Sequence, residues 1–170
     1  ERIFNDLFND TEHTELKSGG DEPIYLPRSD ESLLAQIIST RDYFSSILHE
    51  VSHWCIAGAE RRKLVDFGYW YEPDGRNKLQ QKEFERVEVK PQALEWIFSV
   101  ASRQTFKVSA DNLAAELGPS ELFKSAIFHQ VQAFCEQGVN TRAMRFVDAL
   151  ADFFDVDQVL NCQHYRLEDL

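Results

Sequence analysis

The sequence predicts an α+β fold, a mostly helical single domain with a small β-sheet. Long stretches repeat apolar residues every three or four positions, which is the period of an amphipathic helix. Shorter apolar runs bounded by proline or glycine are typical of strands. The 170 residues contain no internal repeat, low-complexity tract or linker, so we expect one domain over residues 1–170.

The first forty residues are expected to hold one helix and a short strand. Apolar side chains in residues 2–8 fall on one helical face. Residues 15–23 have the glycine, aspartate and proline content of a loop, and residues 24–26 read as a short strand closed by Pro27. The apolar run 33–38 fits a strand or a helix, so both remain open.

The strongest helical pattern covers residues 42–57. Ser39 and Thr40 are candidate N-caps, and Gly58 is a candidate stop. The apolar residues that define this helix are Tyr43, Phe44, Ile47, Leu48, Val51, Trp54 and Cys55.

The middle of the chain is expected to hold an aromatic strand-like stretch and a second long helix. Residues 67–71 have β character, and residues 72–76 carry the Pro, Asp and Gly of a tight turn. A helix is expected over about residues 79–102. Because Pro91 lies inside it and proline fits only a first turn, the sequence allows a restart near residues 87–90.

The last third is expected to be a helical pair. A short strand at residues 106–108 precedes a helical C-terminal portion of about residues 114–160. Its two helices, near residues 120–137 and 141–154, are separated by Gly138, a residue that suits the position after a helix end.

The net charge favours some partners over others. The chain has 18 Lys and Arg against 29 Asp and Glu, which gives −11. Phosphate binding needs clustered cations, so general nucleic-acid binding is not expected. A cationic substrate would be attracted. No apolar run is long enough to cross a bilayer, so no membrane span is expected.

The cysteines indicate a reducing compartment. Cys55, Cys135 and Cys162 are odd in number and share no tight spacing. They match neither a disulfide framework nor a zinc knuckle, so we expect a cytoplasmic protein.

One motif carries chemistry. His49 and His53 are separated by four residues with Glu50 between them, which is the HExxH pattern. On a helix, both imidazoles leave the same face and can reach one metal ion, while Glu50 lies near a metal-bound water. We therefore expect a zincin-like HExxH helix.

Two histidines need a third ligand to hold a metal. Glu88 is the favoured candidate, with Gln92 one turn beyond it as a supporting donor. Glu95 is the next candidate, and Glu85 also lies at helical spacing. The remaining histidines are weaker candidates: His13, His129 and His164.

Two histidines and one carboxylate leave coordination positions open. This donor set serves zinc hydrolases and non-haem Fe(II) oxygenases alike. In a zinc metallopeptidase, Glu50 would be the general base that activates water. A third hypothesis is a binding domain with a structural zinc, which requires four protein ligands.

Five blocks of this sequence resemble the bacterial elongation factor P hydroxylase family (EpmC). They span about residues 20–113 and are far more specific than the five-residue metal motif. The blocks are residues 20–27, 48–58, 66–76, 87–94 and 109–113.

The resemblance implies a cytoplasmic, iron-dependent monooxygenase that hydroxylates the β-lysylated lysine of elongation factor P. Fe(II) would be bound by His49, His53 and Glu88, although zinc or another divalent metal also suits these ligands. Dioxygen would be the co-substrate, and the electron donor is left open. Glu50 would orient a water or relay a proton.

Several other side chains are candidates for holding the lysine arm. Tyr69, Trp70 and Tyr71 would pack on its aliphatic part and face its ammonium group, although a plain strand explains them equally well. Arg76 is a further candidate for substrate binding, with a turn as its alternative role. Asp66 and Asp21 could accept the ammonium group, although isolated acids are usually surface groups.

Overall fold

A computed structural model describes residues 1–40, 43–68, 75–110 and 118–170. The helices found there are α1 (Arg2–Glu12), α2 (Phe44–Ile56), α3 (Lys78–Ala101), α4 (Glu121–Gln137) and α5 (Thr141–Phe154). The strands are β1 (Thr14–Gly20), β2 (Ile24–Leu26) and β3 (Ala35–Thr40). Single 3₁₀ turns are η1 (Arg61–Lys63), η2 (Val65–Gly68), η3 (Cys162–His164) and η4 (Leu167–Asp169). The predicted α+β class is confirmed.

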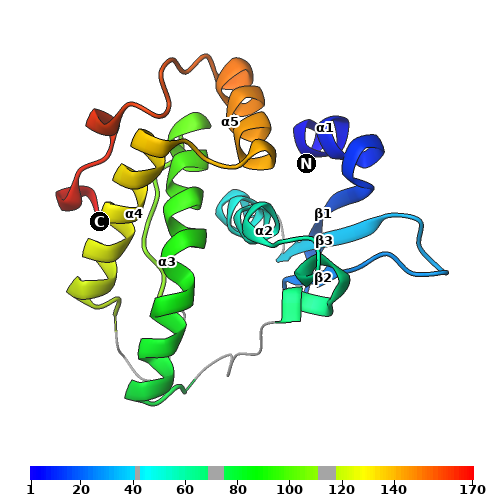
Figure 1. Cartoon of the computed structure of the whole chain (residues 1–170), viewed down its shortest axis with the longest axis horizontal. Coiled ribbons are helices and arrows are strands. Elements are labelled where there is room, and N and C mark those ends of the chain that lie inside the picture. The colour runs from blue at the N-terminus through cyan, green and yellow to red at the C-terminus, as the bar shows by residue number, and fades with distance from the viewer. Residues whose placement is uncertain (41–42, 69–74, 111–117) are drawn as a thin grey trace.

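Helix α2 lies in the middle of the molecule (Figure 1). The sheet and α1 lie on one side of it, and α3 and α4 lie on the other. α3 packs against α2, α4 and α5, so it joins the HExxH helix to the C-terminal helices. None of the helices among the described residues is both long and apolar enough to span a membrane.

The sheet has the strand order β1-β3-β2, with β3 parallel to β1 and antiparallel to β2. The loop expected over residues 15–23 is wrong for its first part, because Thr14–Gly20 forms β1. Leu16 is fully buried, and β3 supplies the hydrogen-bonding partners that the local sequence does not reveal. At Gly20 a Cβ would lie 2.6 Å from the Ile38 side chain, so glycine permits this close pairing.

The strand at residues 24–26 is confirmed. Of the two structures that the sequence allowed for residues 33–38, the strand is the one found, as β3. The expected N-caps of α2 are wrong. Thr40 is still in β3, where its N–H donates to Ser46 Oγ at 3.2 Å, and the cap position is Tyr43. The helix ends at Ile56 with Ala57 as its C-cap, directly before the expected stop at Gly58.

Helix α3 is continuous through Pro91, so the allowed restart near residues 87–90 does not occur. Every residue from 91 to 99 is buried, and this packing offsets the hydrogen bond that proline removes. The helix begins with a capping box formed by Asn77 and Gln80.

One strand expectation is wrong, and another can be followed only in part. Residues 106–108 have no regular structure, because Phe106 instead stacks on Trp96 at a centroid distance of 5.6 Å. In the aromatic stretch 67–71, Phe67 and Gly68 belong to η2, and residues 69–71 lie outside the described residues. The helical pair near the C-terminus is confirmed as α4 and α5, with Gly138 as the C-cap of α4.

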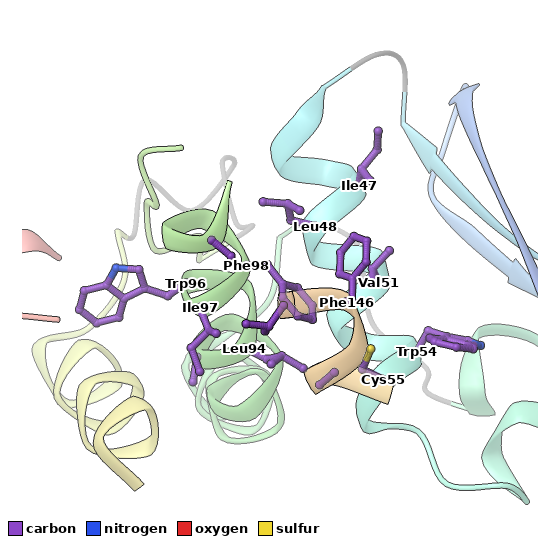
Figure 2. Close-up of a cluster of buried hydrophobic side chains, with 14 of the residues drawn as sticks. Ile47, Leu48, Val51, Trp54, Cys55, Leu94, Trp96, Ile97, Phe98 and Phe146 are labelled. Carbon is purple, nitrogen blue, oxygen red and sulfur yellow. The ribbon is translucent and has the colours of Figure 1, made fainter. Parts of the chain in front are cut away.

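The core is built where α2, α3 and α5 meet (Figure 2). Val51 of α2, Leu94 and Phe98 of α3, and Phe146 of α5 gather there. Phe98 and Phe146 meet edge-to-face at 5.0 Å. These contacts fix α2 and α3 side by side, which is what the metal motif needs.

The carboxyl end of α2 is held by Arg142. Its Nη2 donates to the carbonyl oxygens of Trp54, Cys55 and Ala57 at 3.3, 2.9 and 2.6 Å. Asn140 Nδ2 also donates to the Cys55 carbonyl at 2.9 Å. A helix ends with carbonyls that have no partner inside the helix, and a cation is the most favourable donor for them.

We predict that Arg142→Met lowers the free energy of unfolding by about 2 kcal/mol, because three carbonyls lose a charged donor. Denaturant unfolding followed by circular dichroism measures this loss. Arg166→Met is the matched control, since Arg166 is exposed and makes only a 4.0 Å ion pair with Glu168; it should change stability by less than about 0.5 kcal/mol. Equal stabilities for the two variants would contradict the capping role.

Candidate metal centre

Helix α2 brings the two histidines of the motif together. The Nε2 atoms of His49 and His53 lie 3.1 Å apart, and the ring centroids are 4.7 Å apart with an interplanar angle of 70°. The two nitrogens therefore face one point in space. This confirms that both imidazoles leave one helical face.

Glu88 of α3 completes the cluster. Its Oε1 lies 3.3 Å from His53 Nε2, and its Oε2 lies 3.6 Å from His49 Nε2. The side chain is almost fully buried. One ligand atom from each of these three residues lies within 4.8 Å of the other two, and they are the one such group found among the described residues. The favoured third candidate thus lies beside the histidines.

Glu95 lies on the opposite side of His49. Its Oε2 is 2.8 Å from Nδ1 of that imidazole. A carboxylate can only accept, so Nδ1 carries a proton and Nε2, which faces Glu88 and His53, is the nitrogen available to bind a metal once its own proton is lost. Glu88 and Glu95, the first and second candidates for the third ligand, therefore contact different nitrogens of the His49 ring.

The other candidates have different surroundings. Glu85 accepts from the backbone N–H and the hydroxyl of Ser120 at 3.1 and 2.7 Å, which ties α3 to the start of α4. The three remaining histidines are outside the metal-ligand group of the described residues: His13, His129 and His164.

Gln92 supports Glu88 as its spacing indicated. It lies one turn along α3, is almost fully buried, and its side-chain amide helps to lower the pKa of the Glu88 carboxyl group. Gln92 Nε2 also lies 2.8 Å from the Ser109 carbonyl oxygen, and Ser109 N–H donates to Gln92 Oε1 at 3.1 Å. The amide orientation is thereby fixed from both ends.

Charge at the centre favours a bound cation. Burial disfavours a charged His49, but Glu95, Glu88 and Glu50 outweigh this and raise its pKa to about 10. Burial also disfavours ionised Glu88, yet His53, His49 and Gln92 lower its pKa to about 2. The pocket is negative enough to hold a proton on an imidazole well above neutral pH.

The pKa of Glu50 is shifted in the opposite direction to that of Glu88. Burial raises the pKa of its carboxyl group, the two histidines oppose that shift, and Glu88 and Asp66 add to it. A carboxyl group whose pKa is raised holds its proton more readily than an ordinary glutamate does, which suits a role in proton transfer beside the cluster.

An aromatic contact that the sequence did not reveal packs against His53. The Phe67 ring lies parallel to the His53 ring at a centroid distance of 6.5 Å and stacks on Tyr25 at 4.3 Å. Asp66 and Phe67 both have left-handed backbone conformations, with φ of 49° and 57°. Asp66 Oδ1 accepts the Tyr25 N–H at 2.9 Å, which secures this strained pair to β2.

The residues predicted to bind substrate are only partly described. Tyr69, Trp70 and Tyr71 lie outside the described residues. Arg76 is buried, with 3% of its surface exposed, and donates to Gln81 Oε1 at 3.0 Å and to the Ala110 carbonyl at 2.9 Å. Its guanidinium also lies 4.0 Å over the Phe84 ring. These contacts hold residue 110 to the start of α3.

The donor set fits a divalent transition metal. Two imidazole nitrogens and one carboxylate oxygen converge, and the Nδ1 contact of His49 with Glu95 leaves Nε2 as the nitrogen on the converging side. Iron and zinc both accept such ligands. The group found among the described residues has three donors and not four, so a metal held by them alone would keep open coordination positions.

We predict that metal binding releases close to one proton per ion at pH 7.5. His49 has a pKa of about 10 and is protonated without metal, whereas a ligand imidazole must be neutral. Affinity should therefore rise about tenfold per pH unit between pH 6.5 and 8.5. Calorimetric titration with Co²⁺ in two buffers of different ionisation enthalpy gives the proton count.

The control for this titration is His164→Gln, because that exposed histidine lies outside the cluster. Its removal should leave the number of protons released per metal ion unchanged. An affinity that does not change with pH, with no proton released, would contradict the prediction.

Comparison with known proteins shows the family of this chain. A family model described as elongation factor P hydroxylase matches residues 3–165. A protein named elongation factor P lysine hydroxylase, from Haemophilus influenzae, is 49% identical over 159 residues, which is 94% of this chain and 89% of the relative. Both findings extend the resemblance beyond residues 20–113 into the C-terminal helices. The chain belongs to the elongation factor P hydroxylase family.

Proposed function

We propose that this protein is a metal-dependent hydroxylase that acts on the lysine of elongation factor P, with His49, His53 and Glu88 as its metal ligands. The observation that carries the proposal is the convergence of these three side chains from α2 and α3 in a chain of this family. The relative's name supplies the substrate and the reaction.

Fe(II) is the proposed metal and dioxygen the proposed co-substrate. When bound, iron with open positions allows dioxygen to insert one oxygen atom into a C–H bond, while an external two-electron donor and two protons reduce the other to water. The ligand set also suits zinc, so the metal itself needs measurement. We propose the β-lysylated form of the lysine as the natural substrate, in the cytoplasm, where the free cysteines remain reduced.

The chain's own residues prepare the centre for this reaction. Glu50, whose pKa burial raises, is placed to hold a proton close to the histidines. Phe67 and Tyr25 cover the side of His53 with aromatic surface, which limits access of water there. Tyr69, Trp70, Tyr71 and Arg76 remain our candidates for holding the lysine arm, either directly or by positioning the loops around it.

The zincin-like character of α2 is part of the proposal. It is supported by the two imidazoles one turn apart, by Glu50 beside them, and by the carboxylate from a second helix. A zinc metallopeptidase has the same motif, but the family and the relative are hydroxylases. A structural zinc would need a fourth ligand, and the group found among the described residues has three.

We also propose that residues 1–170 form one hydroxylase domain. A single buried apolar cluster supports this, since its members extend from Phe4 in α1 to Tyr165 near the C-terminus.

We predict that His49→Ala lowers hydroxylation of elongation factor P more than about 100-fold, because the loss of a direct ligand should exceed the 10–100-fold cost typical of an outer contact. The measurement is mass spectrometry of the partner, which gains one oxygen atom. The reaction is run anaerobically and in air, with the enzyme loaded with Fe(II) or with Zn²⁺.

Two further variants make this experiment specific for the metal centre. Glu83→Gln is the control, because Glu83 is exposed on α3 and pairs with Arg86. Glu50→Gln should keep its metal and lose only part of the hydroxylation, whereas a peptidase would lose all of its activity. Full hydroxylation by His49→Ala, with normal iron content, would exclude the proposed centre.

A further inference from the structure

The two nitrogens of His49 face different carboxylates. Nε2 faces Glu88 and His53, while Nδ1 lies 2.8 Å from Oε2 of Glu95. Glu88 and Glu95 are seven residues apart on α3, so they lie on the same helical face two turns from each other. The imidazole of His49 therefore lies between two acids of a single helix.

Glu95 is not placed to be a ligand of the same ion. A metal bound by Nε2 lies beyond the edge of the ring that faces Glu88 and His53. Glu95 contacts the other nitrogen, and it is not in the group of ligand atoms that lie within 4.8 Å of one another. Glu95 therefore contacts the ligand His49 and not the place where a metal ion would bind.

Glu95 is also firmly held. Only 8% of its surface is exposed, and the neighbouring residues 91–99 are all buried. The Ser99 hydroxyl donates to the Glu95 backbone carbonyl at 2.8 Å. Burying a carboxylate is costly unless it is paired, and the pairing found for Glu95 is with His49.

We propose that Glu95 is a positioning residue of the metal centre: it accepts the Nδ1 proton of His49, fixes the tautomer with a free Nε2 lone pair, and locks the orientation of the ring. The inference rests on the proposed metal ligands. An acceptor on the second nitrogen makes an imidazole a more basic ligand and keeps it from rotating. The expected result of losing it is weaker metal binding without loss of the fold.

The test measures Co²⁺ affinity in five purified proteins by competition with a chelator: wild type, Glu95→Gln, Glu95→Ala, Glu88→Gln and Glu83→Gln. Glu95→Ala should weaken binding about 10–100-fold. Glu95→Gln should weaken it less, because the amide oxygen can still accept the Nδ1 proton. Glu83→Gln should bind like the wild type, since Glu83 is exposed and pairs with Arg86.

A second measurement separates positioning from general destabilisation. Nitrogen-15 NMR of the zinc-loaded wild type should show a protonated Nδ1 on His49 in slow exchange with water. In Glu95→Ala this signal should broaden or disappear, while the unfolding midpoint of the metal-free protein changes little. If Glu95→Ala does not fold, the isosteric Glu95→Gln takes its place, with a smaller loss of affinity and an Nδ1–H signal that exchanges faster than in the wild type as the expected results.

The outcomes separate this inference from the proposed centre. Wild-type affinity and an unchanged Nδ1 signal in Glu95→Ala, with binding lost in Glu88→Gln, would refute the positioning role and leave the centre intact. Unimpaired Co²⁺ binding in Glu88→Gln would refute the centre and the inference with it. A loss in Glu95→Gln as large as in Glu88→Gln, with an altered cobalt spectrum, would make Glu95 a ligand and also overturn the inference.

Discussion

The packing of α2 against α3 is the constraint on which the centre depends. The imidazoles come from one helix and the carboxylates that contact them from the other, so neither helix forms the site alone. Apolar side chains such as Val51 and Leu94 hold the two helices together and exclude water from the acids. In this environment each buried charge needs an opposite charge or a donor. The cluster therefore has its strongest attraction for a cation at the point where the donors converge.

The rest of the fold orients α2. Arg142 and Asn140 hold its carboxyl end from the start of α5. On the other side, β2 contributes Tyr25, which stacks on Phe67 and thereby backs the ring of His53. The small sheet and the C-terminal helices thus share a function although they lie far apart in sequence. Their role is to limit rotation and sliding of α2 relative to α3, because a shift of about 1 Å would separate the ligands.

The sequence could predict the centre better than the sheet. HExxH spacing and the helical period are local features, so the common face of His49 and His53 followed from them directly, and Glu88 followed from its buried neighbours. β1 was missed because its stability comes from pairing with β3, which is a non-local interaction. The left-handed pair Asp66 and Phe67 has no signature in a side-chain pattern, since most residues avoid that conformation. Continuity of α3 through Pro91 likewise depends on packing with other helices.

The carboxylates of this site are chemically alike, and their surroundings separate them. Glu88 lies beside two imidazoles and a donating amide, which keep it ionised. Glu50 is buried near other acids, which favours its protonated form. Glu95 contacts the far nitrogen of His49. The two histidines consequently have different supports: charged groups on two sides orient His49, whereas Glu88 and the ring of Phe67 border His53. An arrangement of this kind would let the acids of α3 adjust the basicity of one imidazole by charge, while packing holds the other. The electron density at a metal bound here could then be changed without loosening the helix that carries both histidines.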